Sequence, residues 1–184
     1  MHTSPRTLVL AALLSLAAPA LAAEPGGSLR YPGSGVDVWG ILGWGDGAGL
    51  GVGYHTPVVP EGLLHGTGSR VRDSLDLDLG VDWLSYWGYH VGPNDYGWAQ
   101  LNLHGGVRWD IWLTPEFAFY PKAGLGFGVG WYTGHWDPAF GDRRSIGGLY
   151  PEIALGAAWK ARRDLTLRAE LGAVGLKLGV GFEF

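Results

Sequence analysis

The chain has 184 residues, of which 33 are glycine and 10 are tryptophan, and charged residues make up only 16%. This composition is too poor in charge for an ordinary water-facing surface and too rich in glycine for a helical protein, and the length suits one domain. A net charge of −4 without long basic runs argues against a nucleic-acid partner, and the absence of cysteine excludes disulfides and thiolate metal sites.

Residues 1–22 are predicted to be a signal peptide. Arg6 provides a short positive start, residues 8–21 are apolar, and Ala20 and Ala22 form a small-residue cleavage site that would release Ala23. A transmembrane helix is the alternative, but this apolar run is shorter than the ~20 residues that span a bilayer. Residues 23–34 contain several prolines and glycines and are expected to be a flexible lead-in. The folded domain is then residues 35–184.

From Ser34 onward, apolar residues alternate with polar residues or glycine. This is the period of β-strands whose two faces differ in chemistry, and no segment has convincing helical periodicity. The pattern predicts strands over about 35–44, 49–57, 69–87, 97–113, 117–132, 148–161, 165–171 and 175–184.

The apolar strand faces together are too bulky to lie inside a barrel of eight strands. They include Trp83, Trp109, Trp131 and Trp159, whereas such a barrel is filled by a few side chains or one small ligand. A soluble, lipocalin-like carrier would need these faces inside. Turned outward, they form the lipid band of a membrane barrel, and closure pairs every backbone group. The predicted fold is therefore all-β, an eight-stranded antiparallel up-and-down transmembrane β-barrel.

The last strand has the most specific pattern. Its even positions are Leu176, Leu178, Val180, Phe182 and Phe184, and its odd positions are glycine, Lys or Glu. It resembles the closing strand of bacterial outer-membrane β-barrels, whose assembly machinery reads a terminal Phe preceded by apolar residues at every second position. The row from Leu176 to Phe184 is thus expected to be a membrane-assembly signal.

The whole of residues 35–184 resembles the small OmpA/OmpX-like outer-membrane barrels. The resemblance implies insertion among outer-membrane lipids of a Gram-negative envelope, and an envelope, adhesion or surface-structure role. No peptidoglycan-binding domain is expected after Phe184, so that part of the OmpA family's role is not implied.

Connection lengths predict the orientation. With both ends in the periplasm, the short links 114–116 and 162–164 are periplasmic, and the long links 88–97 and 133–147 are outside, as is usual for such barrels. Aromatic residues then form two interfacial girdles. The lower girdle is predicted to contain Tyr54, Trp109, Phe117, Trp159, Phe182 and Phe184, and the upper one Trp44, Trp83 and Trp131.

Strand parity also predicts which charged side chains face the lumen. Cations and carboxylates are nearly balanced there, which predicts a network of ion pairs and not a water-filled pore, because an unpaired buried charge is costly. The inward cations are Arg72, Arg108, Lys122, Lys160, Arg168 and Lys177, and the inward carboxylates are Asp37, Asp76, Asp78, Asp82, Asp110, Glu152, Glu170 and Glu183.

The closing hairpin offers a specific pair. A two-residue link, Ala173 and Val174, places Glu170 directly opposite Lys177 with both side chains inward. A four-residue link, which would place Gly175 opposite Glu170, is the competing register, because Ala-Val is poor chemistry for a primed turn.

Neither the glycine runs nor the clustered aspartates of the sequence match a cofactor-binding or metal-binding motif. Glycines in the runs 43–53 and 124–130 share one parity within each run, so they do not form a phosphate-binding loop. Asp76, Asp78 and Asp82 share a face but lack the Gly and Glu of an EF-hand loop. We therefore predict that these carboxylates form ion pairs with Arg72, Arg108 or Lys122. We expect no cofactor-binding or metal site.

A lipid-modifying hydrolase would need a histidine beside a serine and a carboxylate in its active site. His55, His90, His104 and His135 have no serine within three residues, although a spatial neighbour is not excluded by sequence. His104 is expected to be a hydrogen-bonded lumen residue. We therefore expect no catalytic residues.

The outer loops are the remaining candidates for function, and their mixed side chains suit contacts with protein or lipopolysaccharide. The sequence does not name their ligand, and loops without a specific function are equally compatible with it. Three rivals to a non-enzymatic envelope protein stay open: a lipid-modifying enzyme, a small channel for solutes, and a soluble carrier. The loop residues concerned are Tyr89, His90, Asn94, Asp95 and Tyr96, and then His135, Trp136, Asp137, Phe140, Asp142, Arg143 and Arg144.

Overall fold

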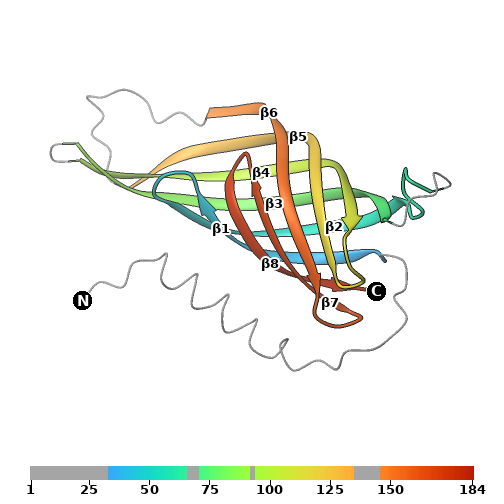
Figure 1. The fold of residues 1–184 in the computed structure, drawn as a ribbon. Coiled ribbons are helices and arrows are strands. Elements are labelled where there is room, and N and C mark those ends of the chain that lie inside the picture. Colours follow the sequence, from blue (N-terminus) through green and yellow to red (C-terminus); the bar gives the residue numbers. More distant parts are fainter. Residues whose placement is uncertain (1–32, 66–70, 92–93, 135–145) are drawn as a thin grey trace.

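The computed structural model describes residues 33–65, 71–91, 94–134 and 146–184. The strands are β1 (Gly35–Gly43), β2 (Gly47–Val59), β3 (Arg72–Val91), β4 (Asn94–Trp112), β5 (Phe117–Gly134), β6 (Ile146–Lys160), β7 (Leu165–Gly172) and β8 (Gly175–Glu183). They close into one barrel in sequence order, each strand antiparallel to its neighbours (Figure 1). The predicted fold class is confirmed. Within the described ranges, no helix is long and apolar enough to cross a membrane.

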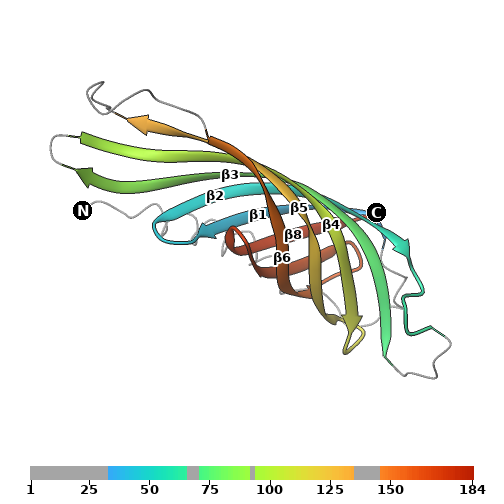
Figure 2. The same cartoon turned by 90° about the horizontal axis from the view of Figure 1, so that it is seen from above.

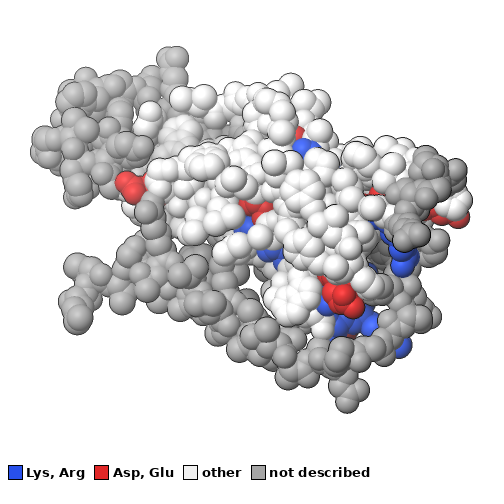
Figure 3. All heavy atoms as spheres, in the orientation of Figure 1, with Lys and Arg blue, Asp and Glu red and all other residues white. Residues whose placement is uncertain are grey.

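The barrel is apolar outside and charged inside, the reverse of a water-soluble protein. Leu50, Leu125 and Leu149 face outward and are 63%, 65% and 78% exposed, whereas Asp82 and Arg108 face the lumen and are 0% and 1% exposed. Figure 3 shows few charged atoms on one outer face, and the largest charged groups lie toward the end with the C-terminus. Exposed apolar and buried charged side chains are the polarity of a transmembrane barrel.

Closure joins the two ends of the barrel chain. β1 pairs with β8 from Gly35↔Glu183 to Gly43↔Gly175. Beyond the pair Gly35↔Glu183, the Phe184 amide donates to the Ser34 carbonyl at 2.9 Å. No strand edge is left open at this seam, which a barrel in hydrocarbon requires.

Inward glycines make room for large side chains on the neighbouring strand. Tyr150 lies across Gly126 and Tyr120 lies across Gly156, and in each case a Cβ on the glycine would overlap the tyrosine ring. The high glycine content therefore follows from a narrow, filled lumen. Further pairs of the same kind are His104 on Gly80, His55 on Gly35, Asp82 on Gly51 and Asp37 on Gly181.

The β7–β8 turn confirms the two-residue link at Ala173 and Val174, and Glu170 lies opposite Lys177. The turn does not need positive φ at Ala173 or Val174, because Gly175 adopts φ 133° instead. A Cβ at Gly175 would also collide with the Leu42 carbonyl oxygen. Glycine is thus required there for both conformation and space.

Asp73 lies on the outer face of β3, where its carboxylate is covered by hydrogen-bond donors from neighbouring residues. Residues 62–64, which follow β2, lie against it, so that Leu63 donates its amide to the carboxylate at 2.7 Å. The Trp109 indole also donates to it at 2.7 Å. Gly62, at φ 70°, allows this approach, since a Cβ there would meet Asp73. The carboxylate is therefore only 6% exposed.

Several details of the sequence prediction are wrong. The link 88–97 is not a long loop, because β3 continues to Val91 and β4 begins at Asn94, with the pairs Tyr89↔Tyr96 and Val91↔Asn94. Arg72, at the first position of β3, is exposed at the end of the barrel and not inside the lumen. β2 continues two residues beyond the predicted end at Pro57, to Val59, with a register shift between these two residues. Residues 1–32 and 135–145, which include the predicted signal peptide and much of the third loop, lie outside the described residues.

We call the end with the β7–β8 turn upper and the end with Phe184 lower. β3 and β4 extend far beyond the β7–β8 and β1–β2 turns at the upper end, as Figures 1 and 2 show.

Two apolar clusters occupy the lumen above and below its charged middle. The upper cluster contains Trp39, Ile41, Leu84 and Val174, with Tyr86 and Tyr150 packed against it. The lower cluster contains Ala118, Tyr120 and Ala158, with Trp112 packed against it.

Candidate functional site: an ion-paired lumen

Arg108 on β4 is the first centre of the lumen network. Its guanidinium lies 2.8 Å from Asp76, 3.3 Å from Asp78 and 2.9 Å from Asp110. It also lies over the Tyr120 ring, 5.2 Å from the centroid. Five donor hydrogens in a rigid plane allow one arginine to serve three carboxylates, which is why a single cation can hold this acidic group.

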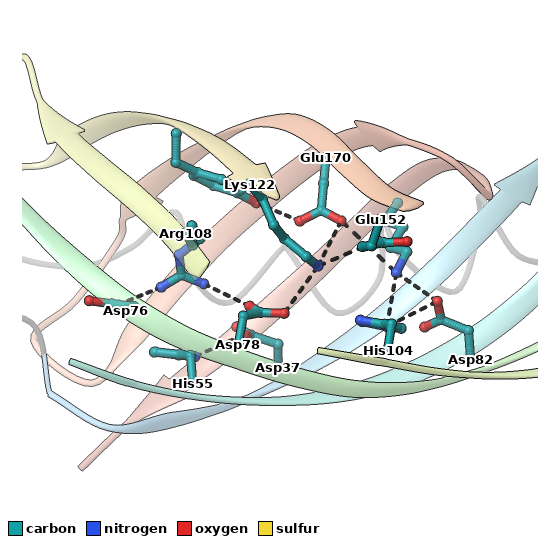
Figure 4. Close-up of polar contacts among 12 residues, drawn as sticks. Asp37, His55, Asp76, Asp78, Asp82, His104, Arg108, Lys122, Glu152 and Glu170 are labelled. Atoms are coloured by element: carbon teal, nitrogen blue, oxygen red, sulfur yellow. Dashed lines mark hydrogen bonds and ion pairs between the residues drawn. The ribbon is translucent and has the colours of Figure 1, made fainter. Parts of the chain in front are cut away.

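Lys122 on β5 is the second centre and reaches across the lumen (Figure 4). Its Nζ lies 3.0 Å from Asp78, 3.4 Å from Glu170 and 3.6 Å from Glu152. The Tyr120 hydroxyl lies 3.5 Å from Glu170 and donates to it. One ammonium thus joins β3, β5, β6 and β7.

Lys177 on β8 is the third centre. Its Nζ lies 2.6 Å from Asp82 on β3, 3.3 Å from His104 Nε2 and 3.9 Å from Glu170. His104 Nε2 is also 3.2 Å from Asp82. Lys177 therefore connects the closing strand to the far wall of the barrel.

Arg168, Asp37 and His55 form a fourth group that joins β7, β1 and β2. Arg168 Nε lies 3.0 Å from Asp37, and its NH2 group lies 3.2 Å from His55 Nε2. An arginine can only donate, so Nε2 accepts, and His55 Nδ1 carries the hydrogen that it donates to Asp37 at 2.9 Å.

At the lower end, Lys160 pairs with Glu183 at 2.8 Å and lies over the Trp112 ring. Thr166 donates to the other Glu183 oxygen at 2.7 Å. With these contacts, every one of the eight strands supplies at least one polar lumen residue.

Carboxylates outnumber cations in this interior. Glu152 is 0% exposed, and neither of its oxygens has a hydrogen-bond donor among the described residues; Lys122 is its nearest cation. The cations are Arg108, Lys122, Lys160, Arg168 and Lys177, and the carboxylates are Asp37, Asp76, Asp78, Asp82, Asp110, Glu152, Glu170 and Glu183.

All nine residues of the predicted network have buried side chains in the lumen. Eight of them are joined by ion pairs into one connected group: Asp76, Asp78, Asp82, Arg108, Lys122, Glu152, Glu170 and Lys177. Arg168 lies in the separate group with Asp37 and His55. The partner of Asp82 differs from the expectation, because Lys177 and His104 contact it and neither Arg108 nor Lys122 does.

Sequence reasoning missed His55 as a member of the network. Its parity in β2, shared with the inward Gly51 and Gly53, was the available signal. The second nitrogen of His55 contacts Arg168, and that of His104 contacts no group in the described residues. Neither histidine contacts a serine in the part of the chain that the structure describes.

The apolar row of the last strand faces outward. Phe182 and Phe184 are 52% and 77% exposed, and Leu176, Leu178 and Val180 are half-buried between β7 and β1. The row therefore lies on the lipid-facing surface at the seam of the barrel.

No protein-family model matches this sequence, and no curated protein matches it. Solved structures are similar in fold. Ail, the attachment invasion locus protein of Yersinia pestis, superposes with a TM-score of 0.53 at 11% identity, over 84% of this chain and 100% of that one. Its complex with the heparin analogue sucrose octasulfate gives 0.53 at 10% identity over the same shares. The N-terminal β-barrel domain of Pseudomonas aeruginosa OprF gives 0.46 at 16% identity, over 83% of this chain and 98% of that one. The chain thus has the fold of the small eight-stranded outer-membrane β-barrels.

Proposed function

We propose that this chain is an integral outer-membrane β-barrel protein of a Gram-negative envelope. It has no enzymatic activity and acts as an envelope component or through its outer loops. The observation that carries the proposal is the reversed polarity of the barrel, with exposed leucines such as Leu125 outside and ion-paired charges such as Arg108 inside. Only a surrounding hydrocarbon phase makes that arrangement favourable.

The contents of the lumen support a structural role over transport. Lys122 and Lys177 each bridge opposite walls, and apolar clusters around Leu84 and Tyr120 lie on either side of the charges. Large side chains therefore occupy the cross-section at several levels. A solute channel would require these contacts to break.

The histidine environments support a non-enzymatic role. His55 Nε2 accepts from Arg168 and so is not a free base, and Asp37 is already held by the other ring nitrogen and by Arg168. His104 is placed between Lys177 and Asp82. A hydrolase needs a hydroxyl or water beside such a histidine.

Targeting and assembly follow from the two ends of the chain. Residues 1–22 act as a cleaved signal peptide, and residues 23–34 are a flexible lead-in to the barrel at 35–184. The outward row from Leu176 to Phe184 is what the barrel-assembly machinery reads. The exposure of Phe182 and Phe184 on the outer face of the closed barrel supports this role, since neither side chain is needed to fill the lumen.

The outer loops contact protein or lipopolysaccharide at the cell surface. The segment 135–145, with His135, Trp136 and the adjacent Arg143 and Arg144, offers aromatic and cationic groups suited to such contacts. The structure of the Yersinia pestis attachment invasion locus protein with a heparin analogue gives one case of a barrel of this fold with a sugar-like ligand.

Expression of the full chain in a Gram-negative host tests the proposal. We expect the protein in the outer-membrane fraction, a mature N-terminus at Ala23 by mass spectrometry, and slower gel migration after boiling, as folded barrels unfold. Leu155→Arg, on the lipid face, is the matched control that should lose this behaviour. Recovery of a folded protein in the soluble periplasmic fraction would contradict the proposal.

Whole-cell binding tests the loop role. Cells with the wild-type protein and cells with residues 135–145 replaced by a Gly/Ser linker are compared for adhesion to host matrix and for lipopolysaccharide packing, measured as detergent sensitivity. Equal levels of folded barrel in both strains are the control. Identical results for the two strains would show that residues 135–145 do not carry the surface function.

A further inference from the structure

The barrel wall has two very different heights. β3, β4, β5 and β6 have 20, 19, 18 and 15 residues, whereas β1, β7 and β8 have 9, 8 and 9. A tilted strand needs about 9–11 residues to cross a bilayer. The short wall therefore only just spans, and the long strands continue beyond it at the upper end (Figure 1).

Strand pairing shows where the long wall stands alone. β6 pairs with β7 only over Ala154–Lys160, so Ile146–Ile153 lie beyond the last paired residue of β7. Leu149 in this stretch lies opposite Phe127 on β5, and Leu101 on β4 lies opposite Trp83 on β3. We name the outward side chains of this region the flank surface; it comprises Trp83, Leu101, Phe127 and Leu149.

The flank surface is apolar and exposed. Leu149 is 78% exposed, and Trp83, Leu101 and Phe127 are 46%, 38% and 43% exposed. The charged residues within the described stretches 81–87, 98–103, 125–133 and 146–153 are Asp82 and Glu152, and both are buried in the lumen. The outer face there has no charge to mark a boundary with water.

The short wall has such a boundary. Its outward residues end with Leu171 and Leu176 at the β7–β8 turn. In the adjacent β1–β2 turn, Trp44, which is 59% exposed, donates its indole hydrogen to the Ala173 carbonyl at 3.0 Å, and the exposed Asp46 follows Trp44 by two residues. Tryptophan near a membrane interface and an acid just beyond it mark the upper limit of the lipid band.

We propose that the flank surface contacts the acyl chains of the outer leaflet, so that the lipid boundary runs obliquely around the barrel. It is low at β7, β8 and β1 and high at β3 to β6. The inference rests on the proposed membrane location. Its main support is continuity: Leu103, Leu125 and Ile153 join the flank surface to the central lipid-facing band without a polar break. A water-exposed apolar surface of this extent would be unstable in a soluble environment.

The consequence is a local difference in membrane thickness or a tilt of the barrel. A bilayer meets a short hydrophobic wall by thinning and a tall one by thickening, or the protein tilts. The short wall beside Trp44 is therefore the side on which lipid packing in the outer leaflet is disturbed. The flank surface is the side that best matches long acyl chains.

The absence of cysteine makes the test direct, because a single substitution introduces a single spin label. Leu149→Cys and Leu101→Cys report on the flank surface, Leu155→Cys on the central band, and Arg163→Cys on the exposed β6–β7 turn as the water reference. Each labelled protein is folded into phosphatidylcholine vesicles, and its folding is verified by heat-modified migration. Accessibility to oxygen and to a water-soluble nickel chelate is then measured by power-saturation electron paramagnetic resonance.

The labels at Leu149 and Leu101 should match that at Leu155, with high oxygen accessibility and several-fold lower nickel accessibility than the label at Arg163. A nickel-accessible Leu149 label beside an oxygen-accessible Leu155 label would overturn the inference and leave the proposed function intact. Nickel accessibility at Leu155 as well would overturn both. Protection of Leu149 from both reagents, with dipolar broadening that disappears on dilution with unlabelled protein, would assign the surface to a second copy of this chain and overturn the lipid assignment.

Discussion

Lys177 on β8 forms its shortest ion pair with Asp82 on β3, 2.6 Å from Nζ to Oδ2, whereas Glu170, directly opposite it on β7, is 3.9 Å away. For Lys177, the position directly opposite on the neighbouring strand therefore does not decide which carboxylate lies closest. The lysine chain is long enough to cross the lumen, and Glu170 already lies near Lys122 and the Tyr120 hydroxyl. The network therefore combines contacts between neighbouring strands, such as Arg108 with Asp76, and contacts across the lumen, such as Lys177 with Asp82.

A double-mutant cycle should distinguish the two partners of Lys177. Lys177→Met should destabilise the barrel by about 3–5 kcal/mol, because it leaves a buried carboxylate unpaired. Combined with Asp82→Asn, it should show a coupling energy of about 1–3 kcal/mol, and with Glu170→Gln less than about 0.5 kcal/mol. The measurement is urea unfolding in lipid vesicles followed by tryptophan fluorescence.

Glu170→Gln alone is the matched control for the chemistry of carboxylate removal. Equal coupling energies for Asp82 and Glu170 would show that Lys177 is shared evenly, and a larger one for Glu170 would show that the hairpin pair dominates in solution.

The strands, their order and their two faces could be predicted from sequence, because period-2 alternation reports side-chain direction at every residue. Parity alone placed Arg108, Lys122 and Lys177 in the lumen. The ion pairs could not be predicted in full, because parity gives a face but not the distance across the barrel. Lys177 and Asp82 are 95 residues apart and belong to strands that do not pair.

The upper ends of the long strands could not be predicted either. The stretch from Trp87 to Trp98 contains Gly, Pro, Asn and Asp, which locally favour turns. Pairing with the neighbouring strand nevertheless extends β3 to Val91 and β4 from Asn94. The prediction that Arg72 faces the lumen was wrong for a simpler reason. The alternation of side chains continues to the first residue of β3, but Arg72 lies at the end of the barrel, where the other strands no longer enclose it.

Charge should be rejected on the outer face of β6 at mid-height. Leu155, which is 55% exposed, faces lipid, so Leu155→Arg should cost about 2–4 kcal/mol. Its inward neighbour, Ala154, is 2% exposed, and Ala154→Ser should change stability by less than about 1 kcal/mol. Unfolding in vesicles measures both variants. Equal stability of Leu155→Arg and wild type would invert the assignment of faces.

A single methyl group should test how tightly the lumen is filled. Gly156→Ala places its Cβ against the Tyr120 ring and should destabilise by about 1–3 kcal/mol through overpacking. Gly148→Ala in the same strand is the matched control, because a Cβ there meets no atom within 4 Å. Thermal unfolding in detergent compares the two variants. A loss shared by both would indicate a backbone effect of glycine removal and not a steric effect of the ring.

Wild-type barrel should show no stable large conductance in a planar bilayer. Lys122→Met removes the ammonium that lies between Asp78, Glu152 and Glu170, and the remaining carboxylates should repel one another and draw in water and cations. We expect small, cation-selective openings from this variant only. Large currents from the wild-type protein would show that the clusters around Leu84 and Tyr120 do not close the lumen, and would favour the channel hypothesis.

Deletion of Phe184 should separate assembly from stability. The residue lies beyond the last residue of β8 and is 77% exposed, and its main fixed contact is the amide hydrogen bond to Ser34. Loss of one such bond costs about 0.5–1.5 kcal/mol, so the truncated chain should refold in detergent nearly as well as wild type. In cells, it should be exported and then fail to reach the outer membrane, because the terminal aromatic residue is the proposed assembly signal.

Phe184→Trp, which keeps a terminal aromatic residue, should assemble normally, and Leu113→Ala, which truncates another exposed apolar side chain, should have no effect. Normal outer-membrane levels of the truncated chain would remove Phe184 from the signal, and failure of the same chain to refold in detergent would assign its role to stability.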